Sequence, residues 1–215
     1  MIGIFGGTFD PVHYGHIKTA LFVKQALNLS RLRFIPNRVP PHRETPWLPA
    51  EERLHLLQCA LNDYDDIVID ERELNRHGPS YMVDTLKELK ADLPGETLCL
   101  IIGMDAFLGI NRWHEWRTIF DYCHVVVMTR PGFDLSGISK GMNTQDYRYI
   151  IDRITDDVSA LSARECGKIL LQSVPELDIS STMIRETLKN KKDISAWVPP
   201  AVCQQLMRNT NNDDR

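Results

Sequence analysis

The sequence, 215 residues long, lacks the features that mark membrane proteins and disulfide-stabilised proteins. Its five cysteines form no CxxC pair and their number is odd, so we expect neither a disulfide framework nor a zinc knuckle. No apolar run approaches the ~18 residues that a membrane span requires. Met1 leads directly into an apolar strand pattern, which leaves no room for a signal peptide. These absences predict a cytoplasmic protein that binds no membrane.

The common signatures of dinucleotide binding and covalent catalysis are also missing. The glycine spacing near the start of the chain fits neither a GxGxxG fingerprint nor a GxxxxGK[ST] phosphate loop. No Ser-His-Asp or Cys-His arrangement indicates a covalent nucleophile, and no protein residues form an evident metal cage. Any reaction would therefore depend on positioning substrates and on stabilising charge.

Charge is distributed unevenly along the chain. The net charge is −4, which argues against broad nucleic-acid binding. Residues 1–43 nevertheless carry an excess of five positive charges, which leaves −9 for the remainder. A basic first fifth of the chain fits a small polyanionic ligand better than a long one, although solvated surface side chains would account for some of these charges.

The most informative stretch covers residues 6–16, with the sequence GGTFDPVHYGH. It follows an apolar run that predicts a strand over 2–5 and precedes apolar periodicity that predicts a helix over 16–27. Paired glycines let the backbone N–H groups approach an anion, and the positive end of the following helix faces the same place. His13 and His16 add donors at the mouth of the helix. The alternative interpretation is a glycine turn with two incidental histidines.

The hydrophobic pattern predicts an α/β protein with a Rossmann-like parallel sheet, helices on both faces and a small C-terminal helical extension. Residues 1–178 would form the core, and residues 179–215 would form a helical part packed on it. The run 98–102 is the most apolar strand and should be central. Further strands are expected over 32–35, 67–69, 124–128 and 168–171.

Two of the predicted helices have features that the structure can test. A helix over 50–61 should turn Leu54, Leu57 and Leu61 to one face. Ser80 should cap the helix that contains Val83, Leu86 and Leu89. Helices over 146–154 and toward Met207 complete the pattern.

Polar residues follow two strands at the carboxyl edge, where ligands bind in open α/β sheets. Five prolines within residues 36–49 make the loop after the second strand stiff, and it carries His42 and Arg43. The strand over 98–102 ends at Gly103, and Asp105 follows, where a carboxylate can accept hydrogen bonds from ribose hydroxyls. The alternative for His42 and Arg43 is that they lie in an ordinary solvated loop. The alternative for Asp105 is that it caps a helix that begins at residue 106.

A second anion-binding pattern lies near the other end of the chain, in residues 179–186, ISSTMIRE. Three hydroxyl side chains precede a helix, and an arginine follows one turn later. A helix needs one such cap, so two of the hydroxyls have no evident folding role. An ordinary helix cap is the alternative interpretation.

Together these stretches resemble the nucleotidyltransferase superfamily that carries the (H/T)xGH motif and a distal (I/V)SSTxxR motif. Within it, the chain is similar nearly end to end to the bacterial nicotinate-nucleotide adenylyltransferase family. Pantetheine-phosphate adenylyltransferases and cytidylyltransferases share the first and last motifs but usually lack the proline-rich loop and the SYxxxTL segment. The further matching segments are PNRVPPHR at 36–43, PSYMVDTL at 79–86, IIGMD at 101–105, Trp113 and RPG at 130–132.

The resemblance implies that ATP and nicotinate mononucleotide give nicotinate adenine dinucleotide and pyrophosphate, with Mg²⁺ bound mainly through the ATP phosphates. No nucleic acid is expected as a partner, and both a monomer and a homo-oligomer are compatible with the sequence. The implied catalytic residues are His13, His16, His42 and Arg43. The implied ATP-binding residues are Gly6, Gly7, Thr8, Phe9, Lys18, Gly103, Asp105, Ser180, Ser181, Thr182 and Arg185. The implied nicotinate-nucleotide-binding residues are Asn37, Tyr81, Met82, Val83, Trp113 and Arg130.

The resemblance also implies how the nicotinate half is held, by stacking on Trp113 and by backbone N–H groups at 81–83 that capture the carboxylate. Met82 stands where relatives often carry a polar residue, and its side chain should matter little if only its backbone contributes. Met104 also replaces a polar residue, which leaves the adenosine contacts there open. Two alternatives remain: the same chemistry on nicotinamide mononucleotide or a phosphopantetheine-like acceptor, and a non-catalytic nucleotide-binding module.

Overall fold

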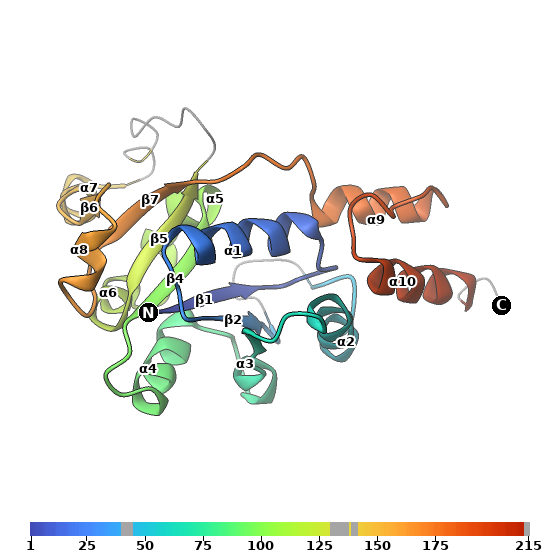
Figure 1. The fold of residues 1–215 in the computed structure, drawn as a ribbon, viewed down its shortest axis with the longest axis horizontal. Helices are drawn as coiled ribbons and strands as arrows, with labels where there is room; N and C mark the ends of the chain where they lie inside the picture. The colour runs from blue at the N-terminus through green and yellow to red at the C-terminus, as the bar shows by residue number, and fades with distance from the viewer. Residues whose placement is uncertain (40–44, 130–137, 139–141, 213–215) are drawn as a thin grey trace.

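The structure is a computed structural model that describes residues 1–39, 45–129, 138 and 142–212, with side chains up to residue 208. Its centre is a seven-stranded sheet in the order β3-β2-β1-β4-β5-β7-β6, in which every pairing is parallel (Figure 1). The strands are β1 (Ile2–Gly7), β2 (Arg31–Pro36), β3 (Ile67–Ile69), β4 (Leu98–Gly103), β5 (His124–Thr129), β6 (Ile154–Thr155) and β7 (Ile169–Ser173).

The order in which strands are added to the sheet reverses between β1 and β4. From β1 the chain builds outward through β2 and β3, and it then returns to add β4 on the other side of β1. The carboxyl ends of β1 and β4 are Gly7 and Gly103, so two glycines flank the crevice that such a reversal creates. The prediction that 98–102 is a central strand is confirmed, because β4 is the fourth of seven.

Helices cover both faces of the sheet, as predicted. The longer ones are α1 (Tyr14–Ala26), α2 (Ala50–Leu61), α4 (Met82–Asp92), α7 (Thr144–Ile151), α9 (Ser181–Lys189) and α10 (Pro200–Asn212). Shorter helical segments are α3 (Arg72–Asn75), α5 (Met104–Leu108), η1 (Ile110–Arg112), η2 (Trp116–Thr118), α6 (Ile119–Tyr122) and α8 (Ser159–Ser162).

Alternate side chains of each strand enter two separate cores. In β4, Cys99 and Ile101 join the core that α1, α2, α9 and α10 share. Leu98, Leu100 and Ile102 join the core on the opposite face, with α4, α5 and α6. This period of two on an all-buried strand is what a sheet covered on both faces requires.

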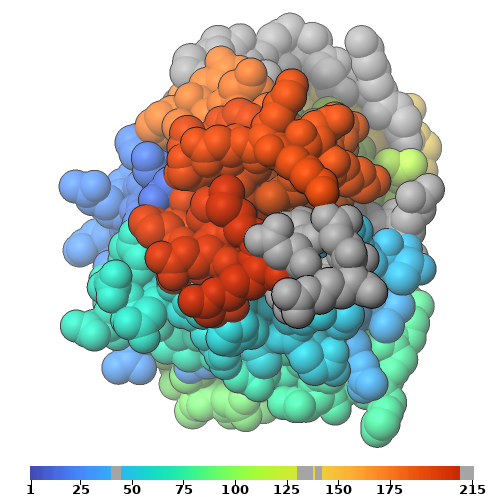
Figure 2. Space-filling model, turned by 90° about the vertical axis from the view of Figure 1, so that its right-hand side faces the viewer, coloured from blue at the N-terminus to red at the C-terminus, as the bar shows by residue number. Residues whose placement is uncertain are grey.

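The C-terminal helices lie against the N-terminal half of the chain (Figure 1). Apolar residues of α9 and α10, including Ile184, Leu188 and Val202, belong to the same core as Phe5 of β1. Figure 2 shows these helices, coloured orange to red, packed beside the cyan region that leads into α2. The division of the chain at residue 178 stays a prediction. Across the described residues, no helix is both long enough and apolar enough to cross a membrane.

Two local predictions were inexact, and one short strand was missed. Helix α1 begins at Tyr14, two residues before the predicted start, because Tyr14 and Gly15 interrupt the apolar period that marks the rest of the helix. On α2, Leu57 and Leu61 are buried as predicted, but Leu54 is only half-buried and Arg53 is buried in addition. The two-residue strand β6 was not predicted, since two residues give no detectable pattern.

Candidate active site

The glycine turn and the start of α1 place two imidazole rings in contact. His13 is the residue that precedes α1, and His16 lies in its first turn. Their ring centroids are 3.7 Å apart, with an angle of 30° between the planes. A Cβ at Gly15 would lie 2.8 Å from Cε1 and Nδ1 of His13, so only glycine leaves room for this ring. The HYGH sequence therefore builds a stacked histidine pair at the mouth of a helix.

Aromatic residues beneath the pair hold His16 in place. The ring of Phe9 meets that of His16 edge to face, with centroids 5.3 Å apart. Phe9 itself is 2 % exposed and packs on Phe5 and Phe34. Its backbone has φ 49°, in the left-handed region that a bulky residue rarely adopts. The side chain of Phe9 thus supports the pair from inside the core.

Burial determines the charge of His13. The side chain is 5 % exposed, and burial lowers its pKa to about 4 because the protonated form loses its hydration. The ring is therefore neutral near pH 7. Within the described part of the chain, its buried Nδ1 atom has no hydrogen-bond partner. An orphaned buried nitrogen is rare and marks a position where a ligand or water completes the site.

The two ends of the chain meet at this turn. Arg185 Nη1 in α9 donates to the carbonyl oxygen of Asp10 at 2.6 Å, and Ser181 Oγ donates to that of Pro11 at 3.1 Å. The carbonyl of Ile179 lies 3.4 Å from the place where a Cβ on Gly15 would sit. The predicted phosphate motif at 179–186 is thereby fastened directly to the predicted phosphate turn at 6–16.

The start of α9 has the predicted cap. Ser180 accepts a hydrogen bond from the backbone N–H of Met183 at 3.2 Å, and Arg185 Nη2 donates to Thr182 Oγ1 at 3.1 Å. Ser180 and Thr182 are exposed, and Ser181 is half-exposed. Hydroxyl groups and a guanidinium therefore gather next to the imidazole pair. Lys18, one turn into α1, lies with Nζ 4.7 Å from the centroid of the Tyr14 ring.

Two buried charged residues that sequence reasoning missed tie the surrounding loops to the turn. The carboxylate of Asp10 accepts hydrogen bonds from the backbone N–H groups of Trp47 and Leu48, at 2.7 and 2.9 Å. Arg53 is 1 % exposed and donates to three backbone carbonyls, one of them that of Thr8 at 2.6 Å. Burial lowers its pKa, while the nearby charge of Asp10 acts in the opposite direction. The sequence signal that could have indicated the burial of Arg53 is its helical spacing from Leu57 and Leu61, which places the three side chains on one face of α2.

The start of α4 forms the second part of the site, and here a prediction was wrong. Ser80 does not cap α4; Tyr81 precedes the helix, and it makes no capping hydrogen bond through its side chain. Ser80 Oγ instead accepts from the backbone N–H of Arg38 at 3.2 Å. The first N–H groups of α4, beginning with Met82 and Val83, are therefore not satisfied by a side-chain cap.

A buried carboxyl group supports this helix start. Glu73 is 3 % exposed and accepts a hydrogen bond from Thr85 Oγ1 at 2.6 Å, and burial raises its pKa. Above the helix start, the ring of Tyr81 stacks on His114 with centroids 4.3 Å apart. His114 was not among the predicted site residues, because an exposed histidine between Trp113 and Glu115 has no distinguishing local pattern.

Gly103 and Asp105 lie where the prediction put them, at the carboxyl end of β4. Gly103 precedes α5, and a Cβ placed on it would meet no atom within 4 Å, so the space beside it is open. The alternative that Asp105 caps this helix is wrong, since Asp105 lies in the first turn and is exposed. Trp113 is half-buried, whereas Trp116 is 7 % exposed and packs on Phe120, which confirms that one of the two belongs to the core.

The glycine turn is joined to the segment after β2. Asn37 donates its backbone N–H to the carbonyl of Gly7 at 3.1 Å, and its side-chain amide lies 3.4 Å from Thr8 Oγ1. A Cβ at Gly6 would lie 2.7 Å from Cε of Met82, so the Met82 side chain reaches from α4 to the turn. The expectation that the Met82 side chain matters little for substrate binding stays a prediction. His42, Arg43 and Arg130 lie outside the described residues.

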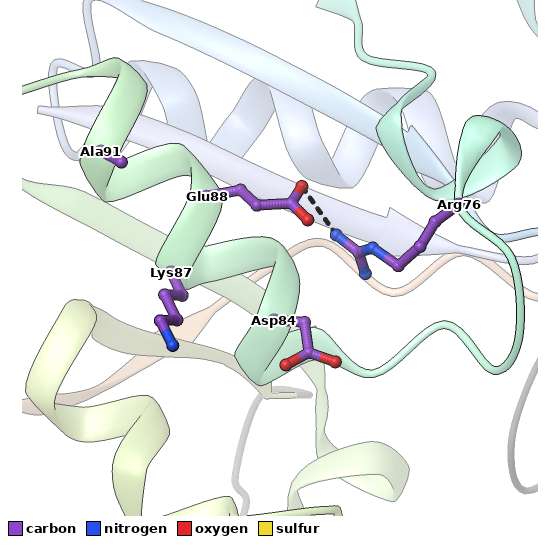
Figure 3. A pocket seen from close by; sticks show the side chains of 5 residues that line it. All are labelled: Arg76, Asp84, Lys87, Glu88 and Ala91. Atoms are coloured by element: carbon purple, nitrogen blue, oxygen red, sulfur yellow. Dashed lines mark ion pairs between the residues drawn. The ribbon is translucent and has the colours of Figure 1, made fainter.

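A depression of about 490 Å³ lies elsewhere, on the outer surface of α4 (Figure 3). Its most prominent interaction is an ion pair between Arg76 and Glu88, 2.8 Å long. None of the residues that converge on the glycine turn lines it. The lining residues are Arg76, Asp84, Lys87, Glu88 and Ala91.

Comparison with known proteins agrees with this geometry. The family model described as cytidylyltransferase-like matches residues 4–187, from within β1 into α9, and so includes both stretches that are predicted from sequence to bind phosphate. The chain belongs to the cytidylyltransferase-like family. In this family the chain is similar over nearly its whole length to curated proteins named "probable nicotinate-nucleotide adenylyltransferase".

Two such relatives are from Halorhodospira halophila and Methylococcus capsulatus. The first is 45% identical over 206 residues, covering 96% of this chain and 92% of the relative. The second is 43% identical over 210 residues, covering 97% of each. Membership of the cytidylyltransferase-like family thus rests on a match over residues 4–187, and the similarity to these relatives extends over nearly the whole chain.

Solved structures confirm the fold of this family member. A nicotinic acid mononucleotide adenylyltransferase of Plasmodium falciparum, complexed with APC, has a TM-score of 0.68 at 18% identity, covering 100% of this chain and 98% of that one. The same enzyme complexed with NaAD gives a TM-score of 0.67 at 19% identity, with the same coverage.

Proposed function

We propose that this protein transfers the adenylyl group of ATP to nicotinate mononucleotide, giving nicotinate adenine dinucleotide and pyrophosphate, a step of NAD biosynthesis in the cytoplasm. The observation that carries the proposal is the attachment of α9 to the glycine turn through Arg185 and Ser181, beside the stacked pair of imidazoles. The names of relatives at 43 and 45% identity support the same substrates.

The reaction needs no covalent nucleophile from the protein. A phosphate oxygen of the mononucleotide attacks the α-phosphorus of ATP in line, and the bond to pyrophosphate breaks, so positioning and charge stabilisation suffice. His13 and His16 would donate hydrogen bonds to the phosphates and stabilise the charge that develops at the α-phosphorus. His42 and Arg43 would contribute from the loop after β2. A neutral His13 can donate one hydrogen bond without placing a charge in the core.

The remaining phosphate and adenosine contacts come from both ends of the chain. The turn would surround the triphosphate with backbone N–H groups. Gly103, with open space beside it, would let the adenosine ribose approach, and Asp105 would accept hydrogen bonds from its hydroxyls. The residues assigned to ATP are Gly6, Gly7, Thr8, Phe9, Lys18, Gly103, Asp105, Ser180, Ser181, Thr182 and Arg185.

The nicotinate half would bind at the start of α4. The N–H groups of Met82 and Val83 point along a helix dipole that favours a carboxylate over a neutral amide. Trp113 would stack on the pyridine ring. Asn37, Tyr81 and Arg130 complete the set assigned to the mononucleotide.

The donor set of this site is suited to phosphate oxygens and not to a bare cation. Imidazoles, hydroxyls and a guanidinium gather at the turn, and among the described residues no group of three or more His, Cys, Asp or Glu could hold a metal ion. Mg²⁺ fits as an ion held by the triphosphate and water, where it would neutralise phosphate charge.

An acceptor profile tests the proposal. The purified protein is given ATP and Mg²⁺ with nicotinate mononucleotide, nicotinamide mononucleotide or phosphopantetheine, and dinucleotide formation is followed by chromatography together with pyrophosphate release. We expect kcat/KM for the nicotinate substrate to exceed that for the amide at least about tenfold, as expected for a charge-assisted hydrogen bond of ~1.5 kcal/mol or more. A preference for the amide or for phosphopantetheine would reassign the acceptor. No turnover with any of them would favour a binding module.

A further inference from the structure

Residues 37–39 join the two parts of the proposed site. Asn37 is hydrogen-bonded to the carbonyl of Gly7, in the glycine turn. Arg38 donates its N–H to Ser80 Oγ at 3.2 Å, and the backbone N–H of Ser80 donates to the carbonyl of Val39, also at 3.2 Å. This short segment therefore fixes the start of α4 relative to the turn.

The side chain of Arg53 supports the same segment from α2. Its Nη1 donates to the carbonyl of Thr8 at 2.6 Å, its Nη2 to that of Arg38 at 3.3 Å, and its Nε to that of Leu48 at 3.2 Å. The three acceptors come from three segments around the site. The three carbonyls are bound by three different nitrogens of a planar guanidinium, whereas an ammonium group carries its three donors on a single nitrogen and does not reproduce this spacing.

A structural role alone does not account for this choice of partners. Buried carbonyls that end strands and turns need donors, and any buried polar group would stabilise the fold by meeting one. Arg53, however, joins the turn after β1 to the segment that holds Ser80, and Asp10 reinforces the join by holding the N–H groups of Trp47 and Leu48. The residue thus lies between the places assigned to the two substrates.

We propose that Arg53 is a positioning residue that sets the separation between the glycine turn and the start of α4, and so aligns the attacking phosphate with the α-phosphorus. The inference rests on the proposed function, because that function assigns the two substrates to these two places. A displacement of about 1 Å between reacting groups can cost 10²-fold in rate, whereas each half of the site would still bind its own substrate.

The test separates alignment from binding. In Arg53→Lys and Arg53→Met, kcat is measured well below the melting temperature, and the dissociation constants of ATP alone and of nicotinate mononucleotide alone are measured by calorimetry. We expect kcat to fall about 10- to 100-fold while both dissociation constants change less than about threefold. Ser80→Ala, which releases the N–H of Arg38, should give the same pattern with a smaller loss of about 3- to 10-fold.

Arg153→Met is the matched control. Arg153 Nη1 donates to the carbonyl of Tyr149 at 2.9 Å, and its guanidinium covers the Tyr149 ring, so its loss removes a similar contact at the far edge of the sheet. We expect its kcat to stay within about twofold of the wild type.

Three results would overturn the inference alone: kcat in the Arg53 variants no lower than in Arg153→Met, dissociation constants that weaken in parallel with kcat, or failure of both Arg53 variants to fold, which would assign the residue to folding. Absence of product from the wild-type protein would instead overturn the proposed function, and the inference with it.

Discussion

Helices α9 and α4 both begin beside the carboxyl edge of the sheet, yet they present different chemistry there. The start of α9 is capped by Ser180, and its side chains are fastened to the glycine turn by Ser181 and Arg185. The start of α4 has no side-chain cap, and Tyr81 beside it stacks on His114. The start of α9 thus presents side-chain donors to a ligand, and the start of α4 presents backbone N–H groups.

The difference matches the anions that we assign to the two places. A triphosphate carries several charges over many oxygens, and flexible hydroxyls with a guanidinium can follow them. A single carboxylate needs two donors at a fixed spacing, which a helix start provides without any side chain. If this comparison holds, substitutions at the turn and in α9 should weaken the use of ATP. Changes to the backbone of α4 should instead weaken the binding of the mononucleotide.

The largest effect is expected from the imidazole pair next to α9. His16→Ala removes a donor that would act on the transferring phosphate, so we expect kcat/KM to fall at least ~100-fold in a pyrophosphate-release assay. His55→Ala, which changes an exposed histidine on α2, serves as the control and should leave the rate unchanged. Full activity in His16→Ala would remove this residue from the mechanism.

The side chains of α9 are tested by Arg185→Met. The variant loses the contact with the Asp10 carbonyl and a positive charge next to the triphosphate, so KM for ATP should rise about 10- to 50-fold while KM for the mononucleotide changes little. Lys189→Met, an exposed position one turn further along α9, is the control. An equal rise in both KM values would show that α9 does not serve ATP alone.

The backbone of α4 is tested by Met82→Pro. Tyr81 has φ −81° and ψ 125°, which a following proline tolerates, and proline is accepted in the first turn of a helix. The variant loses one N–H, so KM for nicotinate mononucleotide should rise about tenfold and KM for ATP should not. Met82→Leu keeps the N–H and the apolar contact with Gly6, and it should stay within about threefold. A similar loss in both variants would assign the effect to the side chain.

The smallest effect concerns stability in mild acid. The pKa of His13 is lowered to about 4 in the folded protein, so between pH 6.5 and pH 4 the unfolded chain binds more protons than the folded one. The folded protein therefore has its full stability well above pH 6.5 and loses stability as the pH falls, by about 1 to 2 kcal/mol at pH 5.5. Denaturant titrations of the wild type and of His13→Gln check this, because the variant should lack that part of the pH dependence. An identical dependence of the unfolding free energy on pH in the two proteins would contradict this expectation.

Much of this site could be predicted because its parts are continuous in sequence. The stretches at 6–16 and 179–186 each combine a turn or cap with charged residues, and local backbone rules suffice to place them at helix starts. The parallel sheet followed from strand and helix periods alone.

The predictions failed where a side chain bonds to a distant part of the chain. Ser80 looks like a helix cap because serine before a helix usually is one, but its hydroxyl is used by Arg38, 42 positions away in sequence. Arg53 looks like a solvated charge until its three carbonyl partners are known. Partners of this kind have no local pattern, so only the assembled fold reveals them.

The bond between Ser181 and Pro11 joins residues 170 positions apart. Protein synthesis proceeds from the first residue to the last, so a ribosome-bound chain acquires its glycine turn long before α9 has been made. A chain that has not yet been synthesised as far as residue 181 therefore lacks the α9 half of the proposed ATP site.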